Sequence, residues 1–189
     1  MSTKEYNLKY FIAGVDSLEE YLFSKELYWQ LGIEPSRGDP PFPALTLGNL
    51  LLSRKKSLSF LLQGAEQVQF DSSDHKLEYI HAKWRSAWEK KTEQEIRSRL
   101  KLWQAFLDDY LNDPAANSDR YPYEVRNRVI ISLLANDIGF MSPFEREILE
   151  GLDKTLITIF IPDEFVWEMD LVGAFPKDDF RYLYGKLRD

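Results

Sequence analysis

The chain of 189 residues is 44% hydrophobic and 29% charged, with a formal net charge of −7 at pH 7, and this composition is far from that of chains which stay disordered. Its length suits one large domain, its lack of cysteine excludes disulfides, iron–sulfur clusters and cysteine nucleophiles, and no stretch approaches the roughly 18 apolar residues of a membrane span. We therefore expect a cytoplasmic protein with a single domain over residues 1–189 and no membrane contact.

The first predicted helix begins near Leu18. Ser17 and Glu20 have the S-x-x-E spacing of a capping box, in which hydroxyl and carboxylate satisfy free backbone N–H groups. Apolar residues at near-helical spacing extend this helix to about Leu31, where Gly32 can end it. Four prolines and a glycine then predict a stiff loop over 33–43, and Thr46 is placed to cap a following helix.

The clearest predicted element is one long amphipathic helix over about 74–111. No glycine or proline interrupts this stretch, and its apolar residues repeat with the period of a helix. The segment 89–95 is polar almost all round, so whether the helix continues through it stays open. A helix of this length projects from the globular body, kinks at its centre or pairs with another copy.

The C-terminal third combines helices with an irregular, aromatic-rich segment. A short buried helix closed by Gly139 is expected before the strong start signal Ser142-Pro143-Phe144-Glu145. The helix that follows reaches a β-branched run near 155–161, which favours a minor β element as the alternative. Aromatic residues crowd the chain after Pro162, and a last short helix is expected over 176–184. The fold class is therefore mainly α, a single-domain helical bundle.

Few residues suggest chemistry. Glu78 and His81 have the Glu-x-x-His spacing of metal-bridged helical bundles, but such sites need two of these motifs and the chain has only two histidines. We keep Glu78 and His81 as a candidate polar site only. No nucleophile-elbow, dinucleotide or P-loop motif occurs, so the sequence predicts no catalytic, cofactor-binding or metal-binding residue.

A basic island over 83–101 holds seven Lys/Arg against three Asp/Glu, a local charge of +4 between acidic flanks. Interleaved with Trp84, Trp88 and Trp103, it could bind nucleic acid through phosphate contacts and base stacking. However, the tryptophans follow the apolar stripe, and the overall pI near 5.0 opposes general nucleic-acid affinity. We favour neutralisation of the island by its acidic flanks.

The leading functional hypothesis is a non-enzymatic helical interaction or regulatory protein. It would bind a protein partner or a second copy through the long helix, with Trp84, Trp88 and Trp103 as candidate contact residues. The alternative is a small-molecule-binding protein or an unfamiliar enzyme, with a pocket between the bundle and the aromatic tail. Nucleic-acid binding through the basic island ranks third.

Overall fold

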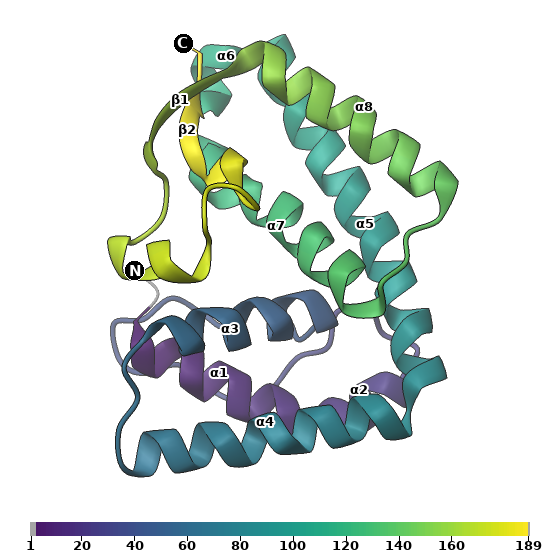
Figure 1. Cartoon of the computed structure of the whole chain (residues 1–189), viewed down its shortest axis with the longest axis vertical. Helices are drawn as coiled ribbons and strands as arrows, with labels where there is room; N and C mark the ends of the chain where they lie inside the picture. Colours follow the sequence, from purple (N-terminus) through teal and green to yellow (C-terminus); the bar gives the residue numbers. More distant parts are fainter. Residues whose placement is uncertain (1–2, 189) are drawn as a thin grey trace. The chain divides into compact units, whose positions relative to one another are not determined.

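The computed structural model describes residues 3–188 and is mainly α-helical, which confirms the predicted fold class. Its helices are α1 (Lys4–Asp16), α2 (Leu18–Phe23), α3 (Leu47–Ser59), α4 (Ala65–Lys83), α5 (Arg85–Asn112), α6 (Pro114–Asn117), α7 (Tyr121–Ile138) and α8 (Pro143–Ile159) (Figure 1). Three short 3-10 helices, η1 (Ser118–Arg120), η2 (Met169–Ala174) and η3 (Arg181–Leu183), and two strands, β1 (Phe160–Phe165) and β2 (Tyr184–Leu187), complete the chain. No helix within the described range is long and apolar enough to cross a membrane.

The chain divides into two compact units, and the division falls inside α5. The first unit ends at Glu95 and the second begins at Ile96. The single domain expected over residues 1–189 therefore stays a prediction.

The core of the first unit forms where α1 packs against α3 and α4 (Figure 1). The rings of Phe11 and Phe70 lie 5.2 Å apart between α1 and α4, and both are buried. On the α3 side, a β-carbon at Gly14 would come within 2.7 Å of the Leu50 side chain. Glycine at this position lets the two helices approach closely.

The predicted first helix differs from the structure at both ends. A helix not anticipated from the sequence, α1, runs almost directly into α2, so Ser17 has helical dihedral angles and its side chain caps nothing. The backbone N–H of Ser17 already bonds to the carbonyl of Ala13, which makes a capping box unnecessary. At the other end α2 stops at Phe23 rather than near Leu31, because the chain turns into an extended segment in which Trp29 pairs with Leu45.

The proline-rich loop over 33–43 contains no helix or strand, as predicted. Two tyrosines of α1 form hydrogen bonds with the C-terminal end of this loop. The hydroxyl of Tyr6 donates to the Pro41 carbonyl and that of Tyr10 to the Ala44 carbonyl, both over 3.1 Å. The ring of Phe42 lies between these two tyrosine rings. Thr46 then caps α3 with its side chain, which confirms the predicted start of that helix.

The long helix predicted over about 74–111 is two helices, α4 and α5, which meet at Trp84. The dihedral angles of Trp84 (φ −115°, ψ 34°) are not helical, and the chain turns a corner there (Figure 1). Beyond the corner α5 continues without interruption through 89–95. Periodicity could not show the break, because the cause is the contact of Trp84 with residues of α2.

One side of the polar centre of α5 is buried, whereas Lys90 and Gln94 are exposed. Lys91, Thr92 and Glu95 are at most 4% exposed. The Lys91 ammonium donates to the backbone carbonyls of Ser24 (3.1 Å) and Glu26 (2.5 Å), and burial lowers its pKa. These bonds tie α5 to the segment that follows α2, and they explain why a polar stretch of helix faces inward.

In the second unit, several local signals behave as predicted. Gly139 ends α7 with φ 65°, and Ser142 and Glu145 form a reciprocal capping box at the start of α8. The β-branched run divides between two structures, since α8 continues to Ile159 and β1 begins at Phe160. The antiparallel pairing of β1 with β2 places Pro162 opposite Gly185.

The aromatic tail contains no α-helix over 176–184, which corrects the expected last helix. Only one turn of 3-10 helix, η3, precedes strand β2. The reason lies in tertiary contacts, because the end of this segment pairs with β1: the Leu183 carbonyl accepts from the Val166 N–H, and β2 begins at Tyr184. The hydroxyl of Tyr121 in α7 also donates to the backbone carbonyl of Tyr182 over 2.5 Å.

Candidate functional site

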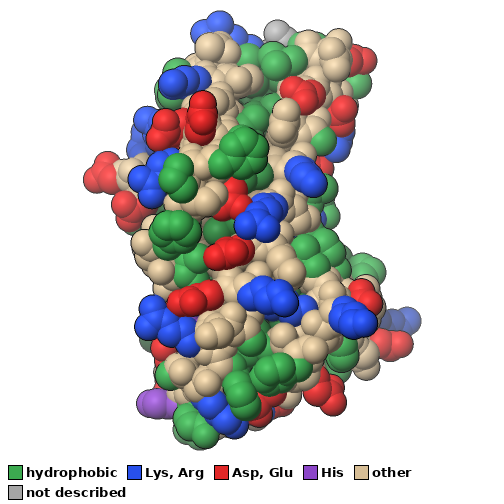
Figure 2. All heavy atoms as spheres, turned by 90° about the vertical axis from the view of Figure 1, so that its right-hand side faces the viewer, with side chains coloured by type: hydrophobic (Ala, Val, Ile, Leu, Met, Phe, Trp, Pro, Cys, Tyr) green, Lys and Arg blue, Asp and Glu red, His purple; other side chains and the backbone are tan. Residues whose placement is uncertain are grey.

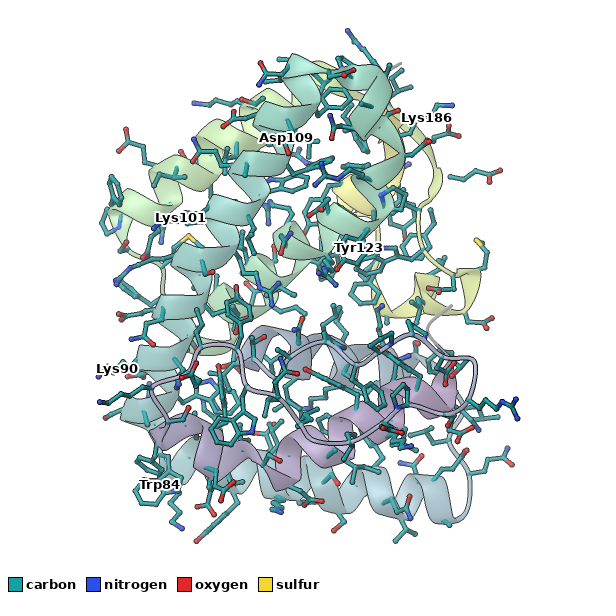
Figure 3. The ribbon with its side chains drawn as sticks, turned by 180° about the vertical axis from the view of Figure 1, so that it is seen from behind. Trp84, Lys90, Lys101, Asp109, Tyr123 and Lys186 are labelled. Atoms are coloured by element: carbon teal, nitrogen blue, oxygen red, sulfur yellow. The ribbon has the colours of Figure 1, made fainter. Side chains whose placement is uncertain are left out.

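The most distinctive surface of the first unit surrounds the corner between α4 and α5. Trp84 is half-buried at this corner (Figure 3), and its ring meets the ring of Phe23 edge to face, with centroids 4.8 Å apart. Phe23, the last residue of α2, is 60% exposed. The two rings therefore present an aromatic pair at the surface.

A lysine connects this pair to a third ring. The Lys83 ammonium lies 4.8 Å from the ring centre of Trp84 and 5.5 Å from that of Tyr79, which is 63% exposed. Both separations are within the range of cation–π attraction. Tyr79 and Lys83 are four positions apart, so they lie on the same side of α4.

Glu19 holds the group together from α2. Its carboxylate accepts hydrogen bonds from the indole N–H of Trp84 (2.6 Å) and from Lys83 (3.1 Å). The indole hydrogen bond and then the lysine lower the pKa of Glu19. We call Glu19, Phe23, Tyr79, Lys83 and Trp84 the junction cluster.

The junction cluster combines one ion pair with partly exposed aromatic rings. Its one carboxylate and one ammonium bond to each other, so neither is placed as a free acid or base. Its rings are held in position and remain partly exposed, which suits contact with another molecule. The sequence indicated Trp84 alone, since Glu19 and Phe23 lie more than sixty positions away and carry no local signal.

The other two predicted contact tryptophans lie in the interior. Trp88 and Trp103 are completely buried. The ring of Trp88 packs on His81 at 4.5 Å, and that of Trp103 stacks on Phe106 at 5.5 Å. Of the three, only Trp84 is positioned to meet a partner without rearrangement.

The two residues of the candidate polar site have different neighbours. The Glu78 carboxylate lies 2.8 Å from the Arg54 guanidinium, which also pairs with Asp74, whereas the His81 ring packs at a tilt on Trp88. Across residues 3–188, no three His, Asp or Glu side chains are grouped to hold a metal ion. A shared role for Glu78 and His81 stays a prediction.

A second polar cluster joins three elements of the second unit. Arg128 of α7 makes two 2.8 Å bonds to the carboxylate of Asp153 in α8 and a third, 2.6 Å, to the hydroxyl of Ser132. The Ser132 oxygen lies 3.0 Å from the hydroxyl of Tyr182. Burial disfavours the charged guanidinium, but Asp153 outweighs it and raises the pKa of Arg128. Among the described residues, the Ser132 hydroxyl meets the Arg128 guanidinium and the Tyr182 hydroxyl, neither of which is a base at neutral pH.

Part of the basic island is paired with carboxylates. Lys83 pairs with Glu19 and Arg97 with Glu145 at 2.7 Å, both outside the island, and Arg85 pairs with Glu89 inside it at 2.8 Å. On the face shown in Figure 2, basic and acidic side chains are interspersed. Neutralisation of the whole island and nucleic-acid binding through it both stay predictions. Lys90, which points away from α5 (Figure 3), is exposed.

No family model, no curated protein and no solved structure matches this chain. Its function therefore has to be inferred from the residues themselves.

Proposed function

We propose that this protein is a non-enzymatic interaction protein that binds a protein partner through the junction cluster. The observation that carries this proposal is the exposure of two rings of the cluster: Phe23, which meets Trp84 edge to face, and Tyr79, which shares the Lys83 ammonium with Trp84. Aromatic residues dominate the binding energy of protein interfaces. The partner would present an apolar or aromatic side chain to these rings.

The fixed geometry of the cluster supports the proposal. Glu19 and Lys83 hold the Trp84 ring by a hydrogen bond and a cation–π contact. Binding would then order few side chains, which reduces the entropic cost of association. Because the contact would be mainly apolar, it would persist at high salt, unlike an interaction based on exposed ion pairs.

The test is an affinity purification of the tagged protein from its native host, with low-salt and high-salt washes. The informative variant is Phe23→Ala combined with Tyr79→Ala, because both side chains are exposed and their removal leaves the core intact. The matched control is Leu58→Ala, whose side chain is 61% exposed elsewhere on the first unit. Trp84 is unsuitable for this substitution, since it is partly buried at the break between α4 and α5.

We expect one stoichiometric protein to survive the high-salt wash with the wild type and with Leu58→Ala, and to fall at least about tenfold with the double variant, a loss typical of removing one or two contact residues. Equal retention by all three proteins would place the contact on another surface. If no protein is retained by the wild type, the proposed function is wrong.

A further inference from the structure

The outward face of α8 has a pattern that the fold itself does not use. Phe144, Glu147, Gly151, Lys154 and Thr158 are spaced alternately by three and four residues, which places them on one side of the helix. All five residues are exposed, and the exposed fraction of Phe144 is 72%.

Gly151 lies in the middle of this face, although nothing within a single chain requires a glycine there. Its φ is not positive, and a β-carbon built on it would meet no atom within 4 Å. A glycine inside a helix is destabilising relative to alanine, so an exposed one with ample space is costly to the isolated chain. Such a glycine is useful where another backbone approaches the helix closely.

The charges of this face are arranged in a self-complementary order. Acidic Glu147 and Glu150 precede Gly151, and basic Lys154 follows it. Over residues 3–188 none of these three side chains forms an ion pair. If two copies of α8 cross antiparallel with a two-fold axis beside Gly151, Glu147 of each copy faces Lys154 of the other, and Phe144 faces Thr158.

We propose that this face of α8 binds the same face of a second copy of the chain, giving an antiparallel, two-fold symmetric dimer. A two-fold axis repeats every contact, so two Glu147–Lys154 ion pairs and two contacts of Phe144 with Thr158 form around the glycine. A hollow of about 270 Å³ adjoins the start of this face, lined by Phe140, Met141, Pro143, Arg146, Glu147 and Glu150. A contact made by one face of one helix corresponds to reversible association.

Charge exchange tests the proposal on the purified full chain by sedimentation velocity at increasing protein concentration. We expect Glu147→Lys and Lys154→Glu each to weaken dimerisation about tenfold or more, because like charges then oppose each other. The double variant with both changes restores the pair and should dimerise like the wild type. Lys101→Glu changes the net charge as Lys154→Glu does, at an exposed position on α5, and should have no effect.

Because the chain contains no cysteine, disulfide trapping can report the orientation. Phe144→Cys and Thr158→Cys proteins, mixed under mild oxidation, should form a mixed disulfide faster than either forms one alone. A wild type that stays monomeric at the highest soluble concentration would overturn the proposal. It would also be overturned if both charge reversals left the dimer unchanged, or if each cysteine variant linked preferentially to itself.

Discussion

The carboxylate of Glu95 accepts a hydrogen bond from the backbone N–H of Gly48 over 2.8 Å, and Glu95 is completely buried. Gly48 is in the first turn of α3, whose N–H groups have no partner within the helix. The negative charge also interacts favourably with the positive end of the helix dipole. One side chain of α5 therefore anchors the start of α3, 47 residues earlier in the chain.

Removing this anchor should destabilise the fold. Glu95→Ala leaves the Gly48 N–H buried without an acceptor, and we expect it to lower the free energy of unfolding by about 2–3 kcal/mol. Glu95→Gln retains an acceptor but loses the charge, so a smaller loss of about 1 kcal/mol is expected. Urea unfolding followed by circular dichroism measures both. Glu34→Ala, in an exposed loop, is the control, and equal losses for all three variants would contradict the role of Glu95.

Gly185→Ala should disrupt the two-stranded sheet. A β-carbon at Gly185 would overlap the backbone carbonyl of Ile161 and the ring of Phe160, and a backbone atom cannot move aside without breaking the pairing of β1 with β2. We expect a loss of about 2–3 kcal/mol in the free energy of unfolding. Gly173→Ala, where a β-carbon meets nothing within 4 Å, is the matched control and should change stability little. Indistinguishable melting temperatures would show that the strands tolerate the added atom.

Tyr121→Phe should change how stability depends on alkaline pH. Burial raises the pKa of Tyr121 above its ordinary value of 10.0. The folded state therefore keeps this proton when the unfolded chain releases it, and the stabilisation present below pH 10 declines as pH rises further. The variant loses about 1 kcal/mol at neutral pH, because its hydrogen bond to the Tyr182 carbonyl is gone. Its stability should then decline less steeply above pH 10. Parallel curves for the two proteins would refute this account.

Breaking the Arg128–Asp153 pair should be costly. Arg128 has a side-chain exposure of 12%, so Asp153→Ala would leave a largely buried cation without its carboxylate. We expect a loss of about 3 kcal/mol, near the lower end for broken buried pairs because Asp153 itself is 23% exposed. The comparison is Asp163→Ala, which removes the exposed pair with Lys186 and should cost less than about 1 kcal/mol. A small effect at both positions would mean that water replaces the carboxylate of Asp153.

The prediction of one domain over residues 1–189 can be tested by calorimetry of the whole chain. A single domain unfolds in one cooperative transition whose calorimetric and van't Hoff enthalpies agree. Two separated transitions would instead show that the units ending at Glu95 and beginning at Ile96 unfold independently.

Local sequence signals predicted the parts of the fold that depend on a few neighbouring residues. The capping box of Ser142 with Glu145, the Thr46 cap and the left-handed Gly139 all occur where expected. The same kind of signal failed at Ser17, because the preceding helix α1 already satisfied the backbone groups that a cap would have served.

The candidate site depended on contacts between distant residues. The helical period predicted helix on both sides of Trp84. It could not show that Trp84 contacts Glu19 and Phe23, or that the helix breaks there. It also placed Trp84, Trp88 and Trp103 on one stripe, whereas two of them are buried and one reaches the surface. Burial is decided by what packs against a helix, which a single segment does not contain.

By itself, therefore, the sequence determined that the chain is mainly helical, where several helices begin and end, and which chemistries are excluded by the absence of cysteine. Tertiary structure alone decided that the polar residues Lys91 and Glu95 face inward. Their partners are backbone groups at Ser24, Glu26 and Gly48, and a backbone carbonyl or N–H is present at nearly every position of any chain. Only folding selects which of these groups meets a given side chain, so no local pattern could have identified them.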